Sequence, residues 1–181
     1  AQSVVIVGAT VADGSGGPLR VANVRVAAGY IAEIGDFKPR EDDAVVEGKD
    51  RVLAPGFIDV HNHSTTGLAR EPLAVSQISQ GITTLLVGQD GSSPLPILGY
   101  LDARRAAPAA VNVGTCICHA SGRRGVMGYD YNRAARPEEI GRMEQLVDRG
   151  FKDGAFCLSS GLEYEIGGYA IPAGSSVIIS P

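Results

Sequence analysis

The first fifty residues alternate between short apolar runs and clusters of turn residues. Residues 4–7 are apolar, and a Gly- and Ser-rich cluster follows at residues 12–17. Residues 23–27 then alternate between apolar and polar side chains, and another short apolar segment covers residues 30–34. Short strands separated by tight turns predict a small antiparallel sheet with hairpin connections. We therefore expect residues 1–54 to form a β module of their own.

After residue 55 the pattern changes, because continuous apolar segments now alternate with amphipathic ones. The predicted strands cover residues 57–60, 82–87, 111–118 and 154–158, the predicted helices cover 71–80, 95–106 and 137–152, and a polar loop is expected over 120–136. Strands that alternate with helices indicate βα units and a parallel sheet. Four such units make half of an eight-stranded barrel, which we place at residues 55–170. Residues 171–181 do not continue the helix expected after the fourth strand, and we interpret them as an atypical tail produced by truncation or a frame change.

Composition excludes some classes of partner. The formal net charge is -4, and the basic residues form no run longer than a pair, so nucleic acid is not an expected partner. No apolar stretch reaches the ~18 residues of a membrane span, so no membrane partner is expected either. The three cysteines are expected to be free thiols packed in strands. The compartment stays open between the cytoplasm and, after removal of a signal segment, the periplasm or the exterior.

His61 and His63 are the strongest candidates for chemistry. They lie two positions apart at the end of an apolar strand, so both side chains are expected on the same face. In a parallel barrel, the carboxyl ends of the strands carry the active site. Two imidazoles at this spacing can chelate one divalent metal ion. The alternative, that both are polar loop residues, is weakened by the apolar strand that runs directly into the pair.

The run APGFIDVHNH at residues 54–63 resembles the start of the first barrel strand in the amidohydrolase superfamily. Three further runs are similar to the D-aminoacylase (N-acyl-D-amino-acid deacylase) branch: QGITTLLVGQDG at 80–91, CHASGR at 118–123 followed by VMG, and GAFCLSSGLEY at 154–164. The resemblance covers residues 3–170 and is to the N-terminal part of the family. It implies an α/β fold, in which the first four βα units of a TIM-type (β/α)8 barrel follow a small β-sandwich-like module. The module at residues 1–54 would be the incomplete part of a composite sandwich.

The same resemblance implies a site and an activity. The activity is metal-dependent hydrolysis of linear amide C–N bonds, with N-acyl-D-amino acids or related amides as small-molecule substrates and zinc as the expected divalent metal. The metal ligands would be His61, His63 and Asp90, although Asp90 stands where the family has a cysteine and could instead be only a turn residue before Gly91. His119 and Arg123 would hold active-site loops or an acidic substrate, or would satisfy local carbonyl groups.

Tyr164 matches a position that contacts substrate in the family, and packing in a Gly-rich loop is the alternative. No catalytic residue is expected within this chain, because the family's general-base aspartate follows the eighth strand and further histidines follow the fifth and sixth. We therefore expect residues 1–181 alone to be inactive and to self-associate through an open sheet edge. Two other readings stay open: a cyclic amidase or deaminase of the same superfamily, and a non-catalytic half-barrel completed by another chain.

Overall fold

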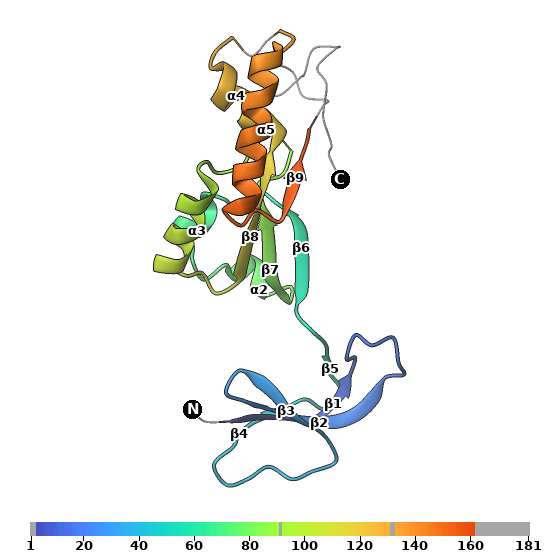
Figure 1. Ribbon diagram of the computed structural model, residues 1–181. Helices are drawn as coiled ribbons and strands as arrows, with labels where there is room; N and C mark the ends of the chain where they lie inside the picture. Colours follow the sequence, from blue (N-terminus) through green and yellow to red (C-terminus); the bar gives the residue numbers. More distant parts are fainter. Residues whose placement is uncertain (1–2, 91, 131–132, 162–181) are drawn as a thin grey trace. The chain divides into compact units, whose positions relative to one another are not determined.

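The computed structural model describes residues 3–90, 92–130 and 133–161 of the chain. Its contacts divide the chain into two compact units, Ala1–Pro55 and Gly56–Pro181. Each unit has its own sheet (Figure 1), and the two are described separately below. None of the described helices is long and apolar enough to cross a membrane. Tyr164 and the tail at residues 171–181 lie outside the described residues.

The first unit is a five-stranded mixed sheet. Its strands are β1 (Val4–Val11), β2 (Arg20–Ala27), β3 (Tyr30–Gly35), β4 (Ala44–Glu47) and β5 (Val52–Leu53). The order is β3-β2-β1-β4, and β5 also pairs with β1. Pairing is antiparallel for β1–β2 and β2–β3 but parallel for β1–β4 and β1–β5. The prediction of an antiparallel sheet was therefore wrong for β4 and β5. Alternation of side chains reports which face is buried and carries no information on strand direction.

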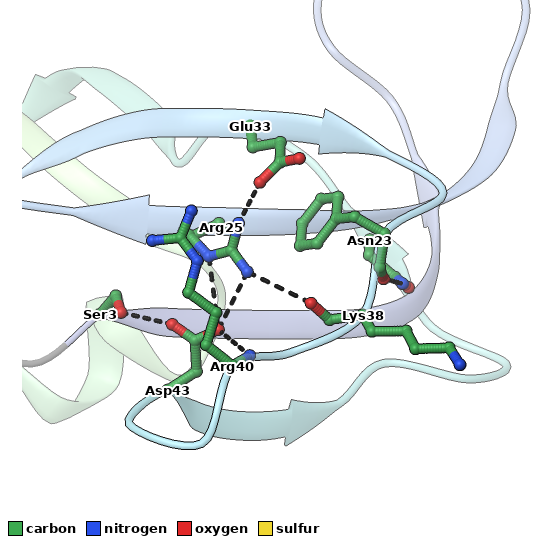
Figure 2. Close-up of polar contacts among 8 residues, drawn as sticks. Ser3, Asn23, Arg25, Glu33, Lys38, Arg40 and Asp43 are labelled. Carbon is green, nitrogen blue, oxygen red and sulfur yellow. Dashed lines mark hydrogen bonds and ion pairs between the residues drawn. The ribbon is translucent and has the colours of Figure 1, made fainter.

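A buried ion pair supports the connection between β3 and β4 (Figure 2). Arg25 on β2 is almost fully buried, and its guanidinium lies 3.0 Å from Asp43 and pairs with Glu33 on β3. The same guanidinium stacks 4.5 Å from the centre of the Phe37 ring. Asp43 also accepts a hydrogen bond from the backbone N–H of Arg40 at 2.7 Å. The hydrogen bond from Arg25 has the largest effect on Asp43, and the one from Arg40 adds to it. Together they hold the pKa of the Asp43 carboxyl well below its usual range.

The second unit contains a curled, four-stranded parallel sheet in which neighbours in sequence are neighbours in space. Its strands are β6 (Phe57–Asn62), β7 (Ile82–Val87), β8 (Asn112–Cys118) and β9 (Cys157–Ser159), in the order β6-β7-β8-β9. The helices are α1 (Gly67–Arg70), α2 (Val75–Ile78), α3 (Ile97–Ala106), α4 (His119–Met127) and α5 (Pro137–Lys152). Because all pairings are parallel, the carboxyl ends of the strands share one edge of the sheet.

Two helical predictions were corrected by the structure. The helix expected over residues 71–80 shrinks to the single turn α2, because Ala74 adopts a left-handed backbone conformation (φ +46°) that interrupts it. The polar loop expected over 120–136 begins as the helix α4. Its Gly122 and Gly125 weaken helix propensity, but a Cβ at either position would lie 3.6–3.8 Å from Leu146 on α5. These glycines therefore lie beside α5, a tertiary neighbour that the hydrophobic pattern does not reveal.

One face of the parallel sheet packs against α3 and α5. Ile97 on α3 and Ile117 on β8 are almost fully buried and share a core cluster with Ala155, to which Leu146 on α5 and Leu158 on β9 add partly buried contacts. By alternation, Cys116 and Cys118 of β8 point to the opposite face, where the interior of a barrel would lie.

The cysteines differ in part from the prediction of free thiols. Cys118 is free and buried, but Cys116 and Cys157 form a disulfide between β8 and β9. These two residues are direct partners in the strand pairing, with Cα atoms 4.5 Å apart. That separation lies within the range that a disulfide spans.

Candidate metal centre

The parallel pairing of β6 and β7 brings together three residues that are far apart in the sequence. His61 lies in β6 and His63 just beyond it, while Asp90 lies three residues after the end of β7. Since the two strands are parallel neighbours, these positions meet at the carboxyl edge of the sheet. The backbone of Asp90 is left-handed (φ +52°), an uncommon conformation that aspartate tolerates better than most residues.

The side chains of this cluster approach one another closely. Asp90 Oδ2 lies 2.7 Å from His61 Nε2 and 3.6 Å from His63 Nε2, and the two imidazole rings have centroids 5.3 Å apart. One ligand atom from each residue lies within 4.8 Å of the other two. The side chains of His61 and His63 are 55% and 63% exposed, and that of Asp90 is 29% exposed. The cluster is therefore open to a small ligand.

The donor set fits a divalent metal ion. Two imidazole nitrogens and one carboxylate oxygen are typical zinc ligands, and an ion ~2.0–2.2 Å from each would place them ~3–4 Å apart. The observed separations are close to that range. In the direct contact between His61 and Asp90, a carboxylate oxygen, which can only accept a hydrogen bond, faces an imidazole nitrogen. A metal ion could replace this contact without large movement of either side chain.

Short polar contacts shape the backbone that carries the histidines. The carboxylate of Asp59 accepts hydrogen bonds from the backbone N–H of His61 at 3.1 Å and from the side-chain amide of Asn62 at 2.8 Å. The Asn62 side-chain oxygen in turn accepts the backbone N–H of Ser64 at 2.8 Å. These contacts hold the end of β6 in one local conformation.

Three serines hold the loop that follows β7 in place. Ser93 Oγ accepts the backbone N–H of Cys118 at 2.9 Å, and the backbone N–H of Ser93 donates to Ser121 Oγ at 2.8 Å. At the other end of the loop, the Ser159 hydroxyl donates to the carbonyl of Gly88 at 2.5 Å. The loop that carries Asp90 is thus tied to β8, α4 and β9. Sequence reasoning missed these serines, and only Ser159 lies within a strand, so the local pattern carries no signal for Ser93 and Ser121.

The candidate residues His119 and Arg123 lie in more buried surroundings than the cluster. His119 begins α4, directly after β8. Burial lowers the pKa of its imidazole, and the charge of Arg123 lowers it further. Arg123 is only 3% exposed and donates to the carbonyl of Arg133, and burial lowers its pKa as well. No hydrogen bond or ion pair among those described joins His119 or Arg123 to His61, His63 or Asp90.

Comparison with known proteins finds relatives over most of the chain, although no protein-family model matches it. The N-acyl-D-aspartate deacylase of Alcaligenes xylosoxydans xylosoxydans is 37% identical over 183 residues, which cover 88% of this chain and 36% of that protein. The N-acyl-D-glutamate deacylase of the same organism is 35% identical over 190 residues, covering 92% of this chain and 38% of that protein. The chain thus spans well under half the length of these relatives.

Solved structures give the same result. A D-aminoacylase with a binuclear metal centre has a TM-score of 0.82 at 33% identity and covers 90% of this chain, which corresponds to 39% of that structure. The N-acyl-D-glutamate deacylase of Bordetella bronchiseptica, complexed with zinc and a phosphonate inhibitor, has a TM-score of 0.83 at 31% identity over 91% of this chain. By sequence and by fold, this chain is similar over about nine-tenths of its length to D-aminoacylase and to N-acyl-D-amino-acid deacylases.

Proposed function

We propose that this chain provides the first ligands of the metal centre in an amidohydrolase that cleaves the amide C–N bond of N-acyl-D-amino acids. One observation carries the proposal: His61, His63 and Asp90 converge within 4.8 Å at the carboxyl edge of a parallel sheet. The similarity to deacylases over about nine-tenths of the chain supports it. We also propose that β6 to β9 are the first four strands of a (β/α)8 barrel, since their order follows the sequence.

The three side chains would divide the binding of the metal between them. His61 and His63 would bind through Nε2, and Asp90 through Oδ2, and we propose zinc because this donor set suits it. When bound, such an ion makes its water a nucleophile near neutral pH and polarises the scissile carbonyl. The Asp90 carboxylate also brings one negative charge, which offsets part of the charge of a divalent ion.

The residues after β8 fit a supporting role. Arg123 is buried and donates to the carbonyl of Arg133, which favours holding the loop after α4 over direct contact with an acidic substrate. His119 lies at the carboxyl end of β8, on the edge of the sheet that carries the cluster, and we propose it as a substrate-side residue together with Tyr164. A general base is not among the residues that we assign. Turnover is therefore proposed for the protein that contains the whole barrel, and not for residues 1–181 alone.

We infer the substrate class from the relatives that align over most of this chain. The relatives that match about nine-tenths of this chain include deacylases named for N-acyl-D-aspartate and N-acyl-D-glutamate. Their identity of 37% and 35% over this length favours linear N-acyl amino acids over the cyclic amides that other members of the superfamily hydrolyse. It also favours an enzyme over a half-barrel that serves only as a binding module.

The test is a hydrolysis assay of the protein that contains the whole barrel. We expect it to release amino acid from N-acetyl-D-aspartate, N-acetyl-D-glutamate or N-acetyl-D-methionine and to prefer these to the L enantiomers. A chelator should abolish the reaction and Zn²⁺ should restore it. Equal rates on both enantiomers, preference for a cyclic amide, or no hydrolysis by the zinc-loaded protein would each contradict the proposal.

A further inference from the structure

The side chain of Gln89 bridges the two strands that carry the candidate ligands. Gln89 directly precedes Asp90 in the loop after β7. Its Nε2 donates to the carbonyl of Val60 in β6 at 2.8 Å, and it also lies 3.3 Å from Cys116 Sγ in β8. Val60 directly precedes His61. One side-chain amide therefore connects the residue before one candidate ligand to the residue before another.

The backbone pairing of β6 and β7 is irregular at this place. Asp59 pairs with Leu85 and Asn62 pairs with Val87, so two residues of β6 lie opposite one residue of β7 between these pairs. The bulge contains Val60 and His61. A bulge interrupts the regular ladder and changes the direction of nearby side chains. The ladder alone therefore does not determine where His61 stands relative to β7.

The backbone on which Gln89 is mounted is held in place. Gly88 has a left-handed backbone (φ +85°), and a Cβ at this position would lie 2.7 Å from the carbonyl oxygen of Cys116. The carbonyl of Gly88 accepts the Ser159 hydroxyl. The backbone before Gln89 is therefore held in place, and the hydrogen bond from its amide fixes the loop relative to β6.

We propose that Gln89 is a positioning residue that sets the distance between His61 Nε2 and Asp90 Oδ2, and through it the affinity for the metal. This inference rests on the proposed function. Gln89 does not touch the metal site itself. It acts through the carbonyl of Val60, as side chains that orient metal ligands from outside the coordination shell do. A donor is required, because Nε2 is the part of the side chain that meets the carbonyl.

The experiment is a titration with Co²⁺ of the metal-free protein that contains the whole barrel, followed by its visible absorption spectrum, which reports ligand geometry. Gln89→Ala removes the amide, and Gln89→Glu keeps its shape but replaces the donor with a carboxylate. Both should bind Co²⁺ about 10–100-fold more weakly than the original protein, with a changed spectrum. Asn112→Ala is the matched control, because Asn112 Nδ2 donates to the carbonyl of Thr83 at 3.2 Å near the amino ends of β7 and β8. It should bind Co²⁺ like the original protein.

Thermal unfolding and a His61→Ala variant separate the possible outcomes. Unchanged Co²⁺ affinity and spectrum in Gln89→Glu would overturn the positioning role, and so would equal weakening in Asn112→Ala. If Gln89→Ala does not fold, Gln89→Glu decides the matter alone. If the original protein binds no Co²⁺, or His61→Ala binds it equally well, the proposed metal centre itself fails. Weaker binding in both Gln89 variants, with melting temperatures like that of the Asn112→Ala control, supports the inference.

Discussion

Asp90 is the residue on which the chemistry of the cluster depends most. It is the only carboxylate of the three candidate ligands, and it contacts both imidazoles, at 2.7 and 3.6 Å. Its left-handed backbone, at φ +52°, also places it among the few non-glycine residues in that region within the described part of the chain. Unusual backbone conformations of this kind collect at functional sites, where the surrounding structure holds them. The turn signal in the sequence and the ligand role are therefore compatible at this position.

Replacing Asp90 with alanine should strongly reduce metal binding. The variant retains two imidazole donors but loses the carboxylate, so we expect zinc affinity to fall by more than ~100-fold, the upper end of the loss caused by removing an outer-shell partner. Asp102→Ala is the control, since the Asp102 carboxylate is exposed on α3 and pairs with Arg105. Elemental analysis after dialysis checks the result. The same zinc stoichiometry in the two variants would leave Asp90 as a turn residue only.

His119 should titrate at lower pH than an ordinary histidine. Burial disfavours its imidazolium, and Arg123 adds repulsion, so its folded-state pKa lies below 6.5. Above pH 6.5 the group is neutral in both states. As the pH falls, the unfolded chain takes up the proton first, so the stability contributed by neutral His119 is lost as the pH drops through the folded-state pKa. Proton NMR of its imidazole ring checks the direction, and a midpoint at or above 6.5 would contradict it.

For single residues, the sequence predicts those that belong to a motif but not those that act through contacts with residues distant in the sequence. The spacing of His61 and His63 after an apolar strand predicts that they share a site. Asp90 is found through its resemblance to a ligand position. Gln89 and Ser159 act across 29 and 71 residues of sequence, and no local pattern encodes such a contact.

Among the elements, α5 shows how local sequence signals define a helix. Pro137 stands at its first position, and the Glu139 side chain reaches back to accept the backbone N–H of Arg136 at 2.8 Å. Arg133 pairs with the same carboxylate at 2.7 Å. The hydrogen bond from Arg133 has the largest effect, and together these interactions lower the pKa of Glu139 to about 2. The start of α5 is thus held by a single, almost fully buried carboxylate.

Glu139→Gln should destabilise the second unit, whereas Glu138→Gln should not. Glu138 is the neighbouring carboxylate on the same helical turn and is largely exposed. At pH 7 we expect Glu139→Gln to lower the melting temperature by on the order of 5 °C. The difference should shrink as the pH falls from 4.5 toward 2, because the stability from a lowered pKa is present above the unfolded value and lost below it. Parallel melting curves at all pH values would refute this.

Periodicity predicts long, regular elements well and short or close-packed ones poorly. The bounds of β7 and α5 agree with the predicted residues 82–87 and 137–152, since a continuous apolar run and a capped amphipathic helix are strong local signals. By contrast, α4 contains two glycines on the side that faces Leu146 of α5, and β4 pairs parallel to β1 through contacts far along the chain. Tertiary contacts determine such elements, and a local pattern does not contain them.

At the scale of the whole molecule, the parallel sheet has two edge strands among the described residues. Both β6 and β9 pair on one side only. Phe57, Ile58 and Val60 on β6 are exposed, and so is Phe156 beside β9. Unpaired backbone groups next to exposed apolar side chains favour pairing with another chain. Burying that surface gains ~25 cal/mol per Å² of apolar area.

We therefore predict that residues 1–181, expressed alone, self-associate in a concentration-dependent manner. Light scattering should report multiples of the monomer mass at micromolar concentration. Ile58→Lys places a charge on the exposed edge strand and should at least halve the associated fraction. Leu73→Lys, which changes an exposed leucine between α1 and α2, should leave that fraction unchanged. A monodisperse monomer, or equal effects of the two substitutions, would count against an open sheet edge.

The central claim, that the carboxyl edge of this sheet holds a divalent metal ion, is tested most directly by diffraction from Zn²⁺-soaked crystals at the zinc absorption edge. We predict one anomalous peak ~2.0–2.2 Å from His61 Nε2, His63 Nε2 and Asp90 Oδ2. The peak should disappear in crystals of Asp90→Ala soaked in the same way. A peak bound only by other residues, or no peak while His61 and Asp90 keep their 2.7 Å contact, would contradict the account.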